Sequence, residues 1–111
     1  MIENLFKNMK ELTSTEELIM TAILNQDLYG LQIAKAIEEV SNGTKKMKVG
    51  FLYPKLHSLE KKGYVESYWG DKRLEERKGA RRKYYKLTGL GNRVLDENQQ
   101  IRNDLATWQP T

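Results

Sequence analysis

Three side chains that can donate hydrogen bonds to phosphate or base acceptors recur at every fourth position in the middle of the chain. They are Tyr53, His57 and Lys61, which carry a phenol, an imidazole and an ammonium group. A spacing of four places them along one ridge of a helix. An ordinary solvated helix face with a surface histidine is the alternative that the spacing leaves open.

Basic residues are concentrated in the same part of the chain. Residues 44–86 carry 14 Lys and Arg against 5 Asp and Glu, whereas residues 1–43 carry 3 against 7. The net charge of +4 for all 111 residues therefore understates the local positive charge. Such a charge excess suits a polyanion such as nucleic acid, although a lysine-rich solvated face would give the same composition.

The sequence lacks the groups from which most catalytic and metal sites are built. It contains no cysteine and one histidine, which excludes disulfide bonds, thiolate nucleophiles and multi-histidine metal centres. Gly89-Leu90-Gly91 is too short for a nucleotide-binding fingerprint. We therefore expect no enzyme, no metal and no cofactor.

Length and hydropathy indicate one domain that has no contact with a membrane. No apolar run approaches the roughly 20 residues of a spanning helix. The first residues, Met1 to Leu5, lack the basic and then apolar layout of a signal peptide. We expect a cytoplasmic protein.

Hydrophobic periodicity predicts two helices before the basic segment. The first begins at a capping box, formed either by Thr13 with Glu16 or by the pair one residue later, and ends near residues 25–27. The second follows Tyr29-Gly30 and stops at residues 41–43, Ser-Asn-Gly. The predicted buried face of the second helix consists of Ile33, Ala34, Ile37 and Val40.

A third helix and two strands are predicted within the basic segment. The helix begins around residues 50–54, where proline is tolerated in a first turn, and ends at Gly63. Residues 64–69 and 82–87 are rich in aromatic residues and predict strands joined by a charged loop. The predicted core contacts of these elements are Leu52, Leu56 and Leu59 on the helix, and Tyr85 facing Trp69 on the strands.

A final helix, capped by Thr88, runs towards the C-terminus with an apolar residue at every seventh position. Seven-residue spacing is typical of a coiled-coil seam, although packing onto the chain's own core would explain it too. Residues 1–12 also place apolar side chains at helical spacing and predict a helical extension. The predicted dimer interface consists of Leu5, Phe6, Met9, Val94, Asn98, Ile101, Leu105 and Trp108, with Asn98 pairing with its symmetry mate.

This order of elements predicts a mainly α fold with a small β-hairpin. Three helices followed by a hairpin form a winged helix-turn-helix, in which the third helix enters the major groove of DNA and the hairpin reaches the backbone. We assign residues 1–88 to this DNA-binding domain and residues 89–111 to a C-terminal dimerisation helix.

Several short motifs resemble the PadR family of transcriptional regulators, in the family's order and spacing from about Glu16 to Leu95. Phe51 departs from the family, which usually has threonine or serine there, and the hairpin loop is longer than usual. The resembling motifs are Tyr29-Gly30 with Ile33, Leu52-Tyr53-Pro54, residues 56–63, Tyr68-Trp69-Gly70, residues 82–88 and Gly91.

The resemblance implies a homodimeric regulator of transcription, usually a repressor that responds to small molecules or stress. We expect sequence-specific binding of double-stranded DNA at an inverted-repeat operator. The resemblance also allows for a small-molecule effector that binds at the dimer interface. The alternatives are a winged-helix module that docks a protein without specific DNA binding, and single-strand binding through the tyrosines. The predicted DNA-binding residues are Lys48, Phe51, Tyr53, Pro54, His57, Ser58, Lys61, Arg77, Lys78, Arg81 and Arg82.

Overall fold

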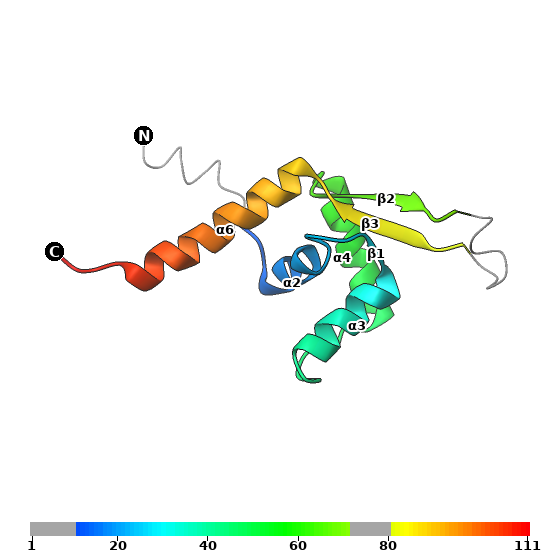
Figure 1. Cartoon of the computed structure of the whole chain (residues 1–111), viewed down its shortest axis with the longest axis horizontal. Coiled ribbons are helices and arrows are strands. Elements are labelled where there is room, and N and C mark those ends of the chain that lie inside the picture. The colour runs from blue at the N-terminus through cyan, green and yellow to red at the C-terminus, as the bar shows by residue number, and fades with distance from the viewer. Residues whose placement is uncertain (1–10, 72–80) are drawn as a thin grey trace.

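Three helices, a three-stranded antiparallel sheet and a long final helix make up the computed structural model, which describes residues 11–71 and 81–111. The hairpin of β2 and β3 and the C-terminal half of α6 extend to opposite ends of the molecule, with the other helices between them (Figure 1). The elements are α2 (Ser14–Ala22), β1 (Leu28–Tyr29), α3 (Gly30–Val40), α4 (Val49–Lys61), β2 (Val65–Trp69), β3 (Lys83–Leu87) and α6 (Gly89–Thr107).

Helix α2 begins at a capping box made by Thr13 and Glu16. The Thr13 hydroxyl accepts a hydrogen bond from the Glu16 amide (3.1 Å), and the Thr13 amide donates to the Glu16 carboxylate (2.9 Å). This confirms the first of the two predicted boxes. The helix ends at Ala22 rather than near residues 25–27, because the next two amides bond to carbonyls three residues back and tighten the last turn.

The core lies where α2, α3 and α4 meet the inner face of the sheet and the first half of α6. Complete burial of each large apolar side chain favours folding by about 1.5–3 kcal/mol. Val40 is 86% exposed, against the prediction that it is buried, because the last turn of α3 extends past the core. The largest fully buried side chains are Ile19, Met20, Ile23, Ile33, Leu52, Leu56, Leu59, Leu95, Val65 and Val94.

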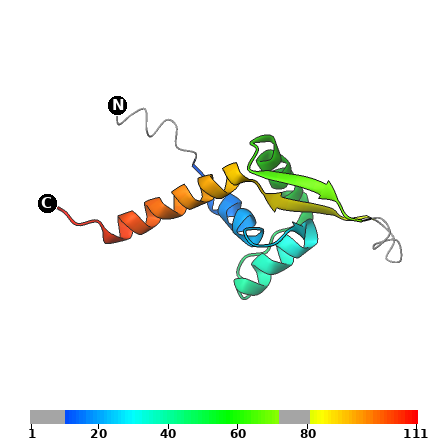
Figure 2. The same ribbon diagram turned by 45° about the horizontal axis from the view of Figure 1, so that its top comes forward.

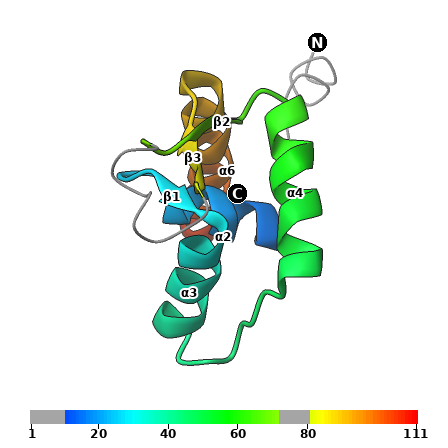
Figure 3. The same cartoon turned by 90° about the vertical axis from the view of Figure 1, so that its right-hand side faces the viewer.

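Helix α4 lies beside α3, and the turn formed by residues 41–48 joins them (Figure 3). Asn42 and Gly43 in this turn have positive φ angles of 52° and 79°, as the helix stop predicts. Pro54 lies inside α4 rather than in its first turn. A proline ring inside a helix crowds the carbonyl of the residue four positions earlier. Here that residue is Gly50, whose flexible backbone can accommodate the ring.

The sheet contains one more strand than the sequence predicts. Its order is β1-β3-β2, and Leu28 in β1 pairs with Tyr85 in β3. Two residues are too short to show the alternation by which strands are recognised, so β1 has no sequence signal. Tyr85 is buried as predicted, but Trp69 is 56% exposed and lies opposite Lys83, because β2 runs past the helices.

Helix α6 is fixed to the domain by its first turn. The Thr88 hydroxyl accepts a hydrogen bond from the Gly91 amide (2.9 Å) and donates to the Gly63 carbonyl (2.6 Å). Further along, Arg102 forms an ion pair with Glu17 of α2. The second half of α6 then projects away from the body, as the turned view shows (Figure 2).

An ion pair also joins α2 to the end of α4. The Lys62 ammonium lies 2.9 Å from a Glu16 carboxylate oxygen. Burial acts to raise the pKa of Glu16, but hydrogen bonds from Lys62 and Thr13 outweigh burial and hold the pKa below its ordinary value. The carboxylate therefore stays ionised at neutral pH and keeps the helix cap.

We expect Gly91→Ala to destabilise the domain by about 3 kcal/mol, the upper end of the usual cost of overpacking, because the neighbour is rigid. An added Cβ at Gly91 would lie 2.0 Å from the Tyr64 carbonyl oxygen, which belongs to the backbone and cannot turn aside. Gly89→Ala is the matched control, since a Cβ there meets nothing within 4 Å. Urea unfolding measures both variants, and equal midpoints would contradict this packing.

Candidate functional site

The outer face of α4 is open to solvent, as its periodicity predicts. Leu52, Leu56 and Leu59 are completely buried and turn the opposite side of the helix outwards. Pro54, His57 and Lys61 on that side are exposed. One flank of this face carries Phe51, which is 48% exposed, and Ser58, which is partly buried. The other flank carries Tyr53.

The side chain of Tyr53 packs on α3. Its ring lies across the start of α3, where a Cβ on Gly30 would come within 2.4 Å of the Tyr53 hydroxyl. The absence of a side chain at Gly30 therefore makes room for the tyrosine. This contact turns Tyr53 towards the hairpin and joins the outer face of α4 to a neighbouring groove.

The start of α4 is electrostatically open to an anion. The helix has no side-chain cap at Lys48 and no acidic residue in its first turn. A Cβ on Gly50 would meet nothing within 4 Å, so the backbone there is uncovered. The helix dipole and the uncapped amides favour negative charge at this end, and the exposed Lys48 adds a cation.

A groove of about 400 Å³ lies between the starts of α3 and α4 and the end of the hairpin strands next to their connecting loop. We call it the wing groove. Among the residues that the structure describes, its lining combines three cationic side chains with four aromatic rings and contains no carboxylate. Its lining residues are Tyr29, Leu31, Tyr53, Trp69, Arg81, Arg82, Lys83 and Tyr85.

Aromatic rings hold the cations of the wing groove in place. The Arg81 guanidinium and the Lys83 ammonium lie 5.8 and 5.9 Å from the centre of the Trp69 ring. The Arg82 guanidinium lies 4.8 Å from the centre of the Tyr29 ring. Each such contact contributes about 0.5–1 kcal/mol at an exposed site. A ring orients a cation without cancelling its charge.

Ser67 and Tyr85 on the strands lie against the helices and fix the position of the hairpin. The Ser67 hydroxyl in β2 donates a hydrogen bond of 2.5 Å to Glu60 in α4. Burial, with nearby Glu60 and Tyr53, raises the pKa of Tyr85, which keeps this phenol neutral between helix and sheet. The position of α4 against the hairpin strands is therefore set by a partly buried hydrogen bond and a buried tyrosine.

On its outer face, the sheet is braced by tyrosines. Tyr68 stacks on Tyr84 with ring centres 5.7 Å apart, and Tyr84 meets Tyr29 edge-on at 5.6 Å. The Tyr68 hydroxyl donates a hydrogen bond of 2.5 Å to Asp27, which precedes β1. That bond, assisted by the negative charge of Asp27, raises the pKa of Tyr68 to about 12.

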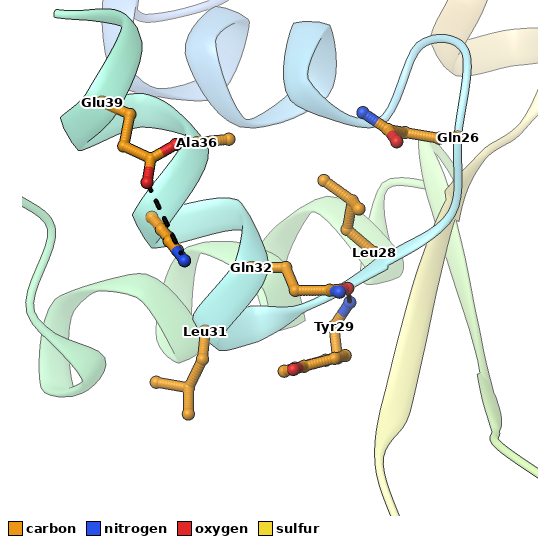
Figure 4. A pocket seen from close by; sticks show the side chains of 8 residues that line it. Gln26, Leu28, Tyr29, Leu31, Gln32, Ala36 and Glu39 are labelled. Carbon is orange, nitrogen blue, oxygen red and sulfur yellow. Dashed lines mark hydrogen bonds and ion pairs between the residues drawn. The ribbon is translucent and has the colours of Figure 1, made fainter. Parts of the chain in front are cut away.

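A second hollow, of about 300 Å³, lies on the flank of α3 next to the wing groove and shares Tyr29 and Leu31 with it (Figure 4). The Tyr29 amide donates to the Gln32 side chain (3.2 Å). Lys35 is paired with Glu39 at 3.8 Å. This hollow offers no nucleophile beside a base, and its one cation is already neutralised.

The predicted dimer seam divides into two parts. Val94 lies in the core of its own chain, and Asn98 accepts from the Leu12 amide (3.1 Å) and donates to the Val94 carbonyl (2.8 Å). Val94 is therefore buried within its own chain and Asn98 is half-buried with these partners, because the first half of α6 packs on α2. The remaining members of the predicted seam are exposed: Ile101 and Leu105 in the second half of α6, and Trp108 directly after it.

Five predicted site residues lie outside the described residues: Leu5, Phe6 and Met9 near the N-terminus, and Arg77 and Lys78 in the hairpin loop. Arg81 and Arg82 lie in the wing groove. The sequence prediction omitted Lys83, although it continues the basic run, and assigned Trp69 to the core. Strand alternation places both on one face, but only the structure places that face beyond the helices.

Two kinds of site are not found in the part of the chain that the structure describes. Residues 11–71 and 81–111 contain no cluster of three or more His, Cys, Asp or Glu that could bind a metal ion. None of the helices in those ranges is long and apolar enough to cross a membrane.

The sequence and the fold both match regulators of transcription. The model of the transcriptional regulator PadR-like family matches residues 19–97. An uncharacterised protein X from Lysinibacillus sphaericus is 37% identical over 82 residues, which cover 74% of this chain and 72% of that protein.

Solved structures of such regulators share the fold. A PadR family transcription regulator from Clostridium difficile R20291 superposes with a TM-score of 0.69 at 31% identity, over 85% of this chain and 92% of that one. A PadR-like transcription factor from Bacteroides fragilis gives a TM-score of 0.72 at 27% identity, over 95% and 90% of the two chains.

We expect Asp27→Asn to return the pKa of Tyr68 from about 12 towards its ordinary value, because the amide carries no negative charge to oppose ionisation. Ultraviolet titration of the tyrosines at alkaline pH measures this change. The phenol of Tyr68 would then ionise at lower pH than in the wild type. Tyr68→Phe identifies the signal, and an unchanged titration in Asp27→Asn would rule out this bond.

Proposed function

The chain belongs to the PadR-like family of transcriptional regulators, and from this premise we propose that it binds double-stranded DNA sequence-specifically as a homodimer. The observation that carries the proposal is the wing groove, whose three cations lie beside the exposed face of α4. A helix that reads base edges and a neighbouring cationic surface that grips phosphates are the two parts of such an interface.

In the proposed complex, α4 lies in the major groove with its first turns towards the bases. His57, Ser58 and Lys61 on its outer face are donors for base edges or phosphates. The uncapped start of the helix and Lys48 receive a backbone phosphate. The predicted contacts of Arg77 and Lys78 with the backbone remain part of the proposal.

The wing groove supplies the remaining backbone contacts. No neighbouring helix holds Arg81, Arg82 and Lys83 in a position to read bases. The aromatic rings beside these cations hold them at the surface. Phosphate contacts of this kind set register and affinity, while the helix sets sequence preference. Tyr53 adds a hydroxyl between the two surfaces.

We propose that the second half of α6 forms the dimer. Ile101, Leu105 and Trp108 lie four and three residues apart and are exposed, with Leu105 at 72%. Two such helices would bury these side chains against each other. A twofold pair of α4 helices then fits an inverted repeat with half-sites about 34–36 Å apart, or a multiple of that distance.

The proposed outcome of binding is repression, because a dimer on an operator blocks transcription. A small molecule that changes the packing of the α6 pair would alter the separation of the two α4 helices and with it the affinity for the operator. Since the proposed ligand is chromosomal DNA, the proposed place of action is the cytoplasm.

We expect the double variant Arg81→Ala/Arg82→Ala to bind DNA from upstream of its own gene more weakly, with a salt dependence of log affinity that is shallower by about one per lost phosphate contact. A salt series with the native fragment and a scrambled duplex measures both quantities. Lys86→Ala/Arg93→Ala removes the same charge from the outer sheet face and from α6 and should change neither. Identical slopes for the two double variants would favour the protein-docking alternative.

We expect Leu105→Glu to convert the dimer to a monomer and to weaken operator binding at least tenfold, because burying an unpaired carboxylate costs several kcal/mol. Analytical ultracentrifugation at micromolar concentration measures the association. Val40→Glu changes an exposed apolar residue at the end of α3 and should leave the dimer intact. A wild-type protein that is monomeric at this concentration would contradict the dimer.

A further inference from the structure

We propose that Phe51 determines sequence specificity by contacting the C5-methyl group of a thymine in the major groove. The inference rests on the proposed binding of duplex DNA and names the base that one side chain of that interface reads.

Folding does not account for the ring of Phe51. It is 48% exposed, and it belongs neither to the buried core nor to the apolar side chains packed against the core. Its neighbour Leu52 fills the core at this level of α4. A single exposed apolar side chain is common on protein surfaces, so exposure alone assigns no role, and the argument depends on where the ring lies.

Phe51 is the third residue of α4 and lies at the end of the helix that reaches base edges in helix-turn-helix complexes. The backbone beside it is uncovered, since a Cβ on Gly50 would meet nothing within 4 Å. The first turn contains no acidic residue that would repel DNA. A duplex that approaches the start of α4 therefore meets the ring at close range.

The ring is also restrained before any ligand arrives. The Lys55 ammonium, one turn further along the same flank, lies 5.4 Å from the centre of the Phe51 ring. This cation–π contact limits the motion of the ring. A restrained apolar group loses less entropy on contact than a free one, which favours a specific over a diffuse contact.

Thymine is the base whose chemistry matches this ring. Its C5-methyl is the apolar group of the major-groove edge, and phenylalanine is among the side chains that contact it. Cytosine at the same position would present an amino donor that the ring cannot satisfy. Phe51 thus favours thymine over cytosine for two reasons, because the ring packs on the methyl group and offers no acceptor to the amino group.

The test removes the methyl group and nothing else. Duplexes bound by the wild type are selected from a random library, and each thymine of the shared site is replaced by deoxyuridine in turn. We expect one thymine per half-site at which the replacement weakens wild-type binding about fourfold, the factor for one buried methyl group. Phe51→Ala should bind the thymine and deoxyuridine duplexes equally, whereas Phe51→Leu should retain part of the difference.

Val40→Ala, an exposed apolar residue on α3, is the matched control and should keep the wild-type sensitivity. A selected site at which no thymine is sensitive, or at which Phe51→Ala keeps the sensitivity, overturns the role of Phe51 and leaves the proposed function standing. A library from which no sequence is enriched overturns the proposed function as well. Unfolding curves establish that Phe51→Ala is folded, and the deoxyuridine series on the wild type does not depend on any variant.

Discussion

The anchoring of α4 by one buried stripe is the constraint on which the rest of the structure depends. Leu52, Leu56 and Leu59 are completely removed from water, and no other orientation of the helix would bury all three. Burial of this stripe forces the opposite side of the helix, with its hydrogen-bond donors, outwards into solvent. The face available to a ligand is therefore a by-product of the hydrophobic core, and its geometry is as rigid as the core itself.

A second feature follows from how the positive charge of the wing groove is held. Carboxylates beside Arg81 and Lys83 would fix these cations but would also cancel the charge that a polyanion needs. The Trp69 ring orients both cations and leaves their charge intact. Carboxylates form ion pairs away from the proposed interface, where Glu16 pairs with Lys62 and Glu17 with Arg102. The distribution of charge thus separates structural contacts from the surface left for binding.

Local signals in the sequence predicted much of this arrangement. The capping box at Thr13, the stop at residues 41–43 and the leucine stripe of α4 each depend on neighbours within a few residues, and the structure has all three. The same local signals predicted the order of the helices and the hairpin, which the structure has. The resemblance to the PadR family is confirmed by the family match over residues 19–97.

The features that the sequence missed depend on long-range packing. Val94 follows the same seven-residue pattern as Ile101, yet only the position of α2 and the sheet decides that the first is buried and the second exposed. The alternation of side chains along β2 places Trp69 on the side of the sheet that faces the helices. The helices do not extend as far as Trp69, so its side chain faces solvent. The turn of Tyr53 over Gly30 has no signal within its own helix.

The most direct test of the central claim is a hydroxyl-radical footprint of the wild-type protein on the DNA upstream of its own gene. The account predicts two symmetric protected segments whose centres lie about one helical turn, or a multiple of it, apart, since two α4 helices related by a twofold axis would occupy them. Two results would contradict the account. One is uniform cleavage of that DNA at protein concentrations that fully bind a control duplex, and the other is a single protected segment with no symmetric second segment.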